Sequence, residues 1–453
     1  MDNFRQRLTH LCQNLLKQCP LDYNHSAAEQ RRADRDCGTF FSGGARNRGI
    51  IYGMKIEREV VALASAVLLS SSLFADVPEV KWGRVNVKEG QKVSAEEARQ
   101  ARSAFDAEKR SAPERATLVF KHSDQDTIAA VAAAFPEASV VEARYSKIDD
   151  MSVIAALANL KEADFYGSTV GDFAPLAACK KLAKLNYYAV KAPQSVYDSI
   201  ASIKSLKELT GGLSGVESVA FVKDLPQLEY FSVFAESVRD LESIGAATGL
   251  KHVKLWNLDG RPLSGRKIPE VGDLKFLAAC GKLEKIELPG SAYTGLEALS
   301  GLKSVKYLDL SAAANDIDFS FAKGYDGLTF VTARLARGKV AGLEALAGKP
   351  LDKIDLEGEF DVDLSFLKES AKLKTLSISA PSPKKTRNVS NFKVVAGLPS
   401  LTALSAIGVN GLDFDAIKSI ASLKSLTIAK GALTAEQVAE LKAAKPKIRV
   451  DER

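Results

Sequence analysis

The sequence has 453 residues, of which 46% are hydrophobic and 26% are charged, and its mean hydropathy is close to zero, at −0.06. These are the values of a folded, water-soluble protein, and the length suits two or three ordinary domains. The formal net charge is +6, but residues 1–53 hold eight basic and five acidic residues, and the charges in 54–75 cancel. Without these segments the net charge is about +3, so the concentrated basic face of a nucleic-acid-binding protein is not expected.

Residues 54–75 have the layout of a secretory signal. Lys55 and Arg58 give a short charged start, an apolar run occupies residues 60–74, and a small residue precedes Asp76. The run is shorter than the roughly 20 residues that a membrane span needs. We therefore expect a signal peptide that begins at Met54, and a secreted or periplasmic (cell-envelope) protein with no membrane span after cleavage.

Residues 1–53 differ from the rest of the chain. They contain three of its five cysteines, Cys12, Cys19 and Cys37, and no repeat. We interpret them as a non-native upstream extension that is disordered. The alternative is a disordered tail that precedes a buried apolar helix instead of a signal peptide.

A helix is expected in residues 76–115. Ser94 and Glu97 have the spacing of a capping box, in which each side chain bonds the backbone N–H of the other residue. The helix should run to about Arg110, before Pro113. Because the terminal repeats of a solenoid must be shielded from water, we expect this segment to be an amino-terminal cap.

From residue 116 to 453 one phrase, L-x-x-L-x-L, recurs about every 22 to 24 residues. Apolar residues at alternate positions predict a short strand with one face inward, and a second apolar piece after each turn predicts a short helix or 3₁₀ turn. A regular period of this length indicates a solenoid. Two weaker units around residues 118–120 and 141–143 precede the clear ones, which begin at Leu160, Leu182, Leu206, Leu228, Leu250, Leu283, Val305, Leu328, Leu351, Leu373, Leu401 and Leu423.

These repeats resemble the leucine-rich-repeat family of the secreted bacterial type. The resemblance implies an α/β solenoid, a horseshoe with a parallel β-sheet on the concave face and short helices or 3₁₀ turns on the convex face. One feature departs from the family, which places Asn three residues after the last leucine of the phrase. Here that place holds Ser168, Ser214, Glu236 and others, so serines, water or helical turns must satisfy the backbone amides of an irregular solenoid.

The end of the chain fits this interpretation. Thr434 and Gln437 have capping-box spacing at the start of a helix, and residues 445–450 offer a last short strand, as in a closing repeat. Two units are longer than the rest, with extra residues at 259–271 and 381–387. Such insertions form loops on one rim, and the first loop is either part of a binding rim or tolerated surface variation. For the second, a solvated basic loop is the better interpretation.

The sequence gives little support for catalysis, and we expect neither an enzyme nor a cofactor or metal site. Beyond residue 75 it has two histidines, His122 and His252, and two cysteines, Cys179 and Cys280. The cysteines occupy equivalent places four repeats apart, so about 19 Å should separate them, too far for a disulfide. The glycine-rich stretch at 211–215 falls in a turn, where glycine is expected without a phosphate ligand.

Aromatic residues recur at two outward-facing positions of the repeat. One is the third position of the phrase, and the other, position seven, is the residue directly after the last leucine. Position seven holds Tyr166, Tyr188, Gly212, Phe234 and Trp256, and position three holds Tyr230, His252, Tyr307 and Phe330. Aromatic residues are also good strand formers, and the rings could instead lean into the core. We predict that the concave face binds its ligand through Tyr166, Tyr188, Tyr230, Phe234, His252 and Trp256.

Two functions fit such a surface. The first is protein–protein binding through the concave face, since exposed aromatic residues beside charges suit a protein interface. The second is carbohydrate binding by a surface or envelope module, in which the same rings stack on sugars. A purely structural envelope protein is a weaker third hypothesis.

Overall fold

The computed structural model of the chain describes residues 77–108, 112–212, 215–235, 238–256, 272–290, 293–311, 316–335, 338–381 and 385–453. All of them belong to one unit, Leu73–Arg453. The proposed extension at 1–53, the signal-like segment at 54–75 and the loop at 257–271 lie outside the described residues. The predictions made for these three segments therefore remain predictions.

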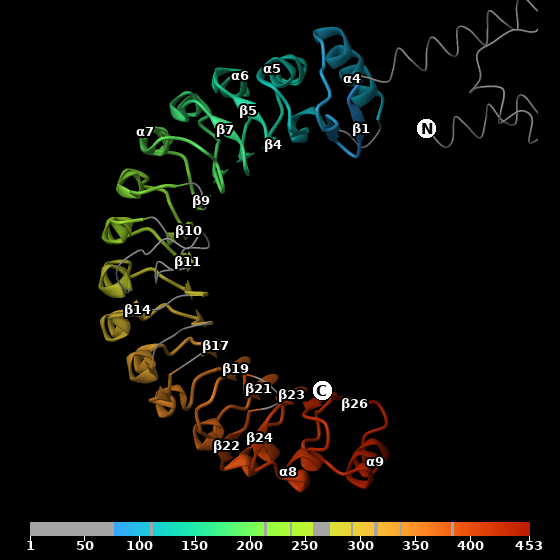
Figure 1. Ribbon diagram of the computed structural model, residues 1–453, viewed down its shortest axis with the longest axis vertical. Helices are drawn as coiled ribbons and strands as arrows, with labels where there is room; N and C mark the ends of the chain where they lie inside the picture. Colours follow the sequence, from blue (N-terminus) through green and yellow to red (C-terminus); the bar gives the residue numbers. More distant parts are fainter. Residues whose placement is uncertain are drawn as a thin grey trace, which may run out of the picture. The chain divides into compact units, whose positions relative to one another are not determined.

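A seventeen-stranded sheet runs through this unit and lines its inner side (Figure 1). Consecutive repeats contribute neighbouring strands, which pair in parallel and in register, whereas the first two strands pair antiparallel. This is the parallel concave sheet that the sequence predicts. In spatial order the strands are β1 (Glu79–Lys81), β2 (Arg84–Asn86), β3 (Thr117–Lys121), β4 (Val140–Arg144), β6 (Glu162–Asp164), β8 (Lys184–Asn186), β9 (Glu208–Gly211), β10 (Tyr230–Phe234), β11 (His252–Trp256), β13 (Lys285–Glu287), β15 (Tyr307–Asp309), β17 (Phe330–Arg334), β19 (Lys353–Glu357), β21 (Thr375–Ser379), β23 (Ala403–Ala406), β25 (Ser425–Ile428) and β26 (Arg449–Glu452).

Short helices form the outer side of the solenoid, and most of those described are 3₁₀ helices of three to six residues (Figure 1). The α-helices are α4 (Ala95–Ala107), α5 (Gln125–Ala134), α6 (Ser152–Ala155), α7 (Gln194–Asp198), α8 (Phe414–Ser419) and α9 (Ala435–Ala444). The 3₁₀ helices are η1 (Pro113–Arg115), η2 (Ala174–Ala178), η3 (Ser199–Ser202), η4 (Ala220–Asp224), η6 (Leu241–Ala246), η7 (Leu274–Ala279), η8 (Leu296–Gly301), η9 (Phe319–Gly324), η10 (Leu343–Leu346), η11 (Leu364–Leu367) and η12 (Phe392–Gly397).

Between strand and helix, several repeats add a two- to four-residue strand to a small parallel ladder. These strands are β5 (Lys147–Ile148), β7 (Thr169–Val170), β12 (Gly272–Asp273), β14 (Tyr293–Thr294), β16 (Ile317–Asp318), β18 (Val340–Ala341), β20 (Val362–Asp363), β22 (Arg387–Ser390) and β24 (Val409–Asn410).

The leucines of the repeated phrase form one continuous core. In the unit that begins at Leu283, the side chains of Leu283, Ile286 and Leu288 are fully buried, and the other units repeat this pattern. Each such side chain stabilises the fold by about 2 kcal/mol relative to an exposed one. Cys179 and Cys280 are buried in the same core as free thiols, as the sequence predicts.

Both expected capping boxes are present. The Ser94 hydroxyl accepts the backbone N–H of Glu97, and the Glu97 carboxylate accepts the backbone N–H of Ser94, at the start of α4. Thr434 and Gln437 exchange the equivalent bonds at the start of α9. Helix α4 ends at Ala107, a turn earlier than expected, since the backbone of Glu108 is already extended.

Serines take over part of the role of the missing Asn ladder. The backbone N–H of Ser123 donates to the Ser146 hydroxyl at 3.1 Å, and that of Ser146 donates to the Ser168 hydroxyl at 2.9 Å. The Ser168 hydroxyl in turn donates to the Ala143 carbonyl. Because these serines occupy equivalent places in consecutive repeats, their side chains link neighbouring turns as the sequence analysis expected.

Core residues on neighbouring strands are matched in size. Tyr187 and Gly211 occupy the same inward position in consecutive repeats, and the Tyr187 ring is fully buried. A Cβ atom added to Gly211 would lie 1.9 Å from the tip of that ring. The glycine therefore leaves the space that the tyrosine fills.

We expect Gly211→Ala to lower the free energy of unfolding by about 1–3 kcal/mol, because the added methyl overpacks the core. The urea midpoint measured by circular dichroism checks this. Gly281→Ala is the matched control, since nothing lies within 4 Å of its Cβ position. Adding Tyr187→Leu to Gly211→Ala should recover part of the loss, and additive effects of the two changes would contradict the packing explanation.

Candidate functional site

The predicted position-seven residues form a line of rings along the concave face. The centroids of Tyr166 and Tyr188 lie 5.4 Å apart, those of Tyr188 and Phe234 lie 6.4 Å apart, and those of Phe234 and Trp256 lie 6.1 Å apart. Gly212 occupies the place between Tyr188 and Phe234, where its left-handed backbone (φ +124°) and missing side chain leave room for Phe234. The rings are half-buried on the sheet surface and do not lean into the core.

Two further rings, which the sequence analysis missed, extend this line toward the amino terminus. Tyr145 contacts Tyr166 edge to face at 5.3 Å, and His122 stacks on Tyr145 at 5.2 Å. Each follows the position-seven residue of its repeat and adopts a left-handed backbone, with φ of 53° at Tyr145 and 50° at His122. Gly167 lies beneath the Tyr145 ring, and a Cβ atom added to it would lie 2.6 Å from that ring. We call the complete line the aromatic row: His122, Tyr145, Tyr166, Tyr188, Phe234 and Trp256.

Position three carries a second set of rings. Tyr230 and His252 lie 4.5 Å apart on β10 and β11, and farther along the sheet Tyr307 and Phe330 stack at 3.9 Å with nearly parallel planes. Of the six predicted residues, four therefore belong to the aromatic row, and Tyr230 and His252 face it across the same two strands. On β10 and β11 both edges of the concave face are aromatic.

A buried carboxylate lies next to this aromatic centre. Glu287, on β13, has a side chain only 10% exposed, and its Oε1 lies 2.6 Å from Nε2 of His252. An ionised carboxylate only accepts hydrogen bonds, so the imidazole N–H donates. Lys285 Nζ lies 3.0 Å and Lys254 Nζ 3.6 Å from the same carboxylate. Burial alone would raise the pKa of Glu287, but the bonds from His252 and Lys285 and the charges of both lysines lower it to about 2.

The ammonium groups also contact rings. Lys254 Nζ lies 4.5 Å from the centre of the Trp256 ring, and Lys285 Nζ lies 4.3 Å from that of Tyr307. These are cation–π distances. The two aromatic sets and the charged cluster therefore form one continuous surface over β10 to β15.

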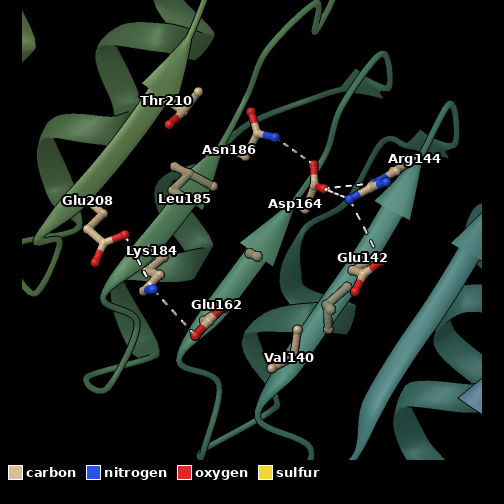
Figure 2. A pocket seen from close by; sticks show the side chains of 12 residues that line it. Val140, Glu142, Arg144, Glu162, Asp164, Lys184, Leu185, Asn186, Glu208 and Thr210 are labelled. Atoms are coloured by element: carbon tan, nitrogen blue, oxygen red, sulfur yellow. Dashed lines mark hydrogen bonds and ion pairs between the residues drawn. The ribbon is translucent and has the colours of Figure 1, made fainter. Parts of the chain in front are cut away.

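Toward the amino terminus, the concave face is hollowed over β4, β6, β8 and β9 (Figure 2), with a volume of about 260 Å³. Lys184 lies between Glu162 and Glu208, at 3.9 and 3.3 Å, and Arg144 binds Asp164 at 2.6 Å. Two of its lining residues, Asp164 and Asn186, accept the backbone N–H groups of Tyr166 and Tyr188 of the aromatic row. The hollow could not be predicted from the sequence, because the side chains at positions three and five of these repeats are charged or polar and show no composition signal of their own.

The described residues show no arrangement for metal chemistry, since no three His, Cys, Asp or Glu side chains among them are grouped to hold an ion. Gly211 and Gly212, from the glycine-rich stretch, make room for Tyr187 and Phe234 respectively. Burial raises the pKa of Cys179 and that of Cys280, the latter to about 11, so both thiols stay protonated. The concave face of the described residues is built from rings and paired charges.

The fold is similar to that of solved leucine-rich-repeat structures. An internalin from Listeria monocytogenes is 15% identical, with 74% of this chain and 88% of the internalin covered and a TM-score of 0.52. A leucine-rich-repeat protein of Leptospira interrogans is 14% identical, with 83% of this chain and 96% of that protein covered, and the same TM-score of 0.52. At these identities the likeness shows the fold alone.

No protein-family model and no curated protein matches this sequence. Among the helices in the described part of the chain, none has the length and apolar character to cross a membrane.

We expect Glu287→Gln to lower the free energy of unfolding at pH 7 by about 2 kcal/mol, because it removes the charge that two lysine ammonium groups and the His252 N–H surround. The folded-state pKa of Glu287, about 2, lies below the ordinary value of 4.5. The contribution is therefore complete above pH 4.5 and is lost as the pH falls toward 2. Urea unfolding of parent and variant should converge over that interval. Glu297→Gln, at an exposed position, is the control, and a difference between Glu287→Gln and the parent that persists at pH 2 would contradict this prediction.

Proposed function

We propose, from the premise that the chain has the leucine-rich-repeat fold, that it is a non-enzymatic protein which binds a protein partner through its concave face. The aromatic row is the observation that supports this most directly. Six rings in unbroken contact lie half-buried or exposed on a rigid sheet, and aromatic residues held in this way are the usual anchors of protein interfaces.

The orientation of the rings favours a protein over a glycan. A sugar stacks on a ring face that is open to solvent, but His122 and Tyr145, Tyr166 and Tyr188, and Phe234 and Trp256 stack on each other, with interplanar angles of 10°, 12° and 10°. In each pair the neighbouring ring covers part of one face, at centroid distances of 5.2, 5.4 and 6.1 Å. The row therefore offers ring edges and tyrosine hydroxyls, which suit the mixed apolar and hydrogen-bonding contacts of a protein surface.

The charges beside the rings support the same proposal. Lys184, Lys254 and Lys285 each lie near carboxylates on the concave face, so both signs of charge are present close to apolar anchors. Such a mixture is typical of the edge of a protein interface, where charge pairs fix the orientation of the partner. The alternative is a carbohydrate-binding envelope module, and the binding experiment below distinguishes it from a protein-binding one.

We further propose that the protein is exported to the cell envelope or beyond. The support comes from the sequence of residues 54–75, with its charged start, short apolar run and small residue before Asp76. Binding of a partner outside the cytoplasm would follow from this location.

Trp256→Ala combined with Tyr188→Ala should weaken partner binding by at least about tenfold, because truncating an aromatic anchor typically costs 2 kcal/mol or more. Pull-down of cell-surface proteins, run in parallel with a glycan array, measures the loss and identifies the ligand class. Trp82→Ala is the matched control: it removes an indole that is 71% exposed at the turn between β1 and β2, outside the aromatic row. Parental binding by the double variant would refute the concave site, and binding only on the glycan array would favour the alternative.

Amino-terminal sequencing of the exported protein tests the proposed location. Cleavage of a signal peptide after residue 75 predicts Asp76 as the first residue. A mature protein that begins before residue 54, or a product that stays in the cytoplasm, would contradict the proposal.

A further inference from the structure

We infer that the surface around Lys254 and Lys285 is the binding site for an acidic side chain of the partner protein. This inference rests on the proposed function and names the chemistry of the group that the centre of the concave face recognises. It is carried by the arrangement of Glu287 and its neighbours His252, Lys254 and Lys285 between the two sets of rings.

The cluster has more cationic than anionic groups. The ammonium groups of Lys254 and Lys285 both lie near one carboxylate, that of Glu287, which also accepts a hydrogen bond from His252. Glu287 lies beneath them, with its side chain 10% exposed, whereas the Lys254 and Lys285 side chains are 25% and 35% exposed. From the solvent, a partner therefore meets ammonium groups before it meets the carboxylate.

Lys254 is the cation with the most capacity to bind a further anion. Its Nζ lies 3.6 Å from Glu287, beyond a good hydrogen bond, whereas Lys285 and His252 lie at 3.0 and 2.6 Å. The neighbouring strand β10 presents the uncharged Ser232 at the same position. A carboxylate above Lys254 would thus gain a charge-assisted hydrogen bond without displacing an existing one.

Beyond Glu287, the next acidic residue at position five is Asp309 on β15, which pairs in register with Glu287. It accepts the backbone N–H of Ser311 at 2.9 Å, and its charge acts on Arg334. Asp309 is two strands from Lys254, about 10 Å, so it offsets the positive charge at that end of the cluster less than Glu287 does.

The aromatic walls strengthen the site. Lys254 packs on Trp256 and Lys285 on Tyr307, which removes part of their hydration before any partner arrives. In such a partly water-excluded site, a charge pair contributes more than it does on an open surface. The fitting occupant is an extended protein segment in which apolar residues flank an Asp or Glu, so that they contact Tyr230, Phe234 and Trp256 while the carboxylate reaches Lys254.

A random peptide library selected against the full chain tests the inference. We expect the peptides that bind to be enriched in Asp or Glu beside apolar residues. Binding of a selected peptide should fall about tenfold when Lys254→Met is introduced, and should be restored by Lys254→Arg, which keeps the charge. Lys393→Met, at an exposed lysine of η12 on the outer side of the solenoid, is the matched control and should bind as the parent does. Thermal unfolding of each variant confirms that it is folded.

Changing the peptide tests the same contact without altering the chain. Replacing its acidic residue with the matching amide should weaken binding to the parent about tenfold and have little further effect on Lys254→Met, since both changes remove one contact. The informative peptides are those that bind the parent but not the Trp256→Ala, Tyr188→Ala variant. If such peptides lack acidic residues, or bind Lys254→Met as tightly as the parent, the inference is overturned and the proposed function stands. A library that gives no peptide sensitive to either set of variants would overturn both.

Discussion

The structure depends on the in-register parallel pairing of strands that come from consecutive repeats. Val253 on β11 pairs with Ile286 on β13, and Ile286 pairs with Leu308 on β15, so each inward side chain packs on its equivalents in the units before and after it. Because side chains alternate along a strand, the same register also fixes what faces outward. A one-residue slip would exchange the leucine core for the charged and aromatic face, so core stability and the composition of the concave surface are set together.

The register also aligns side chains at the same position of successive repeats. The size of each side chain is therefore limited by its equivalents on the neighbouring strands. Tyr187 can be buried because Gly211 follows it one repeat later, and Phe234 can reach Tyr188 because Gly212 lies between them. Gly167 similarly leaves room for Tyr145. In each case a ring occupies the volume of a side chain missing from the neighbouring unit, which explains how large aromatic residues fit a spacing of about 4.8 Å between strands.

The fold could be predicted from the sequence because the leucine phrase gives both the period and the register of the repeats. Counting from the phrase also placed four rings in one row: Tyr166, Tyr188, Phe234 and Trp256. Tyr145 and His122 were missed because they lie one residue beyond the counted position and reach the row through a left-handed backbone, which the leucine phrase does not encode. The burial of Glu287 was missed for a different reason. Position five faces outward, and its exposure is set by the long side chains beside it, Lys254 on β11 and Lys285 on β13 itself, and not by the backbone.

The concave face changes character along the sheet, and this change limits where a partner can bind tightly. From β4 to β19 it carries rings and paired charges, whereas on β21 to β25 the outward positions hold short side chains such as Thr375, Ser377, Ser405 and Thr427. Short hydroxyl side chains bury little apolar area and carry no charge, so they supply few anchors. The strands β10 and β11, where both aromatic sets and Lys254 meet, concentrate apolar area, ring edges and charge within two repeats. A partner held there would use the remaining concave face for orientation, with most of its binding energy coming from the centre.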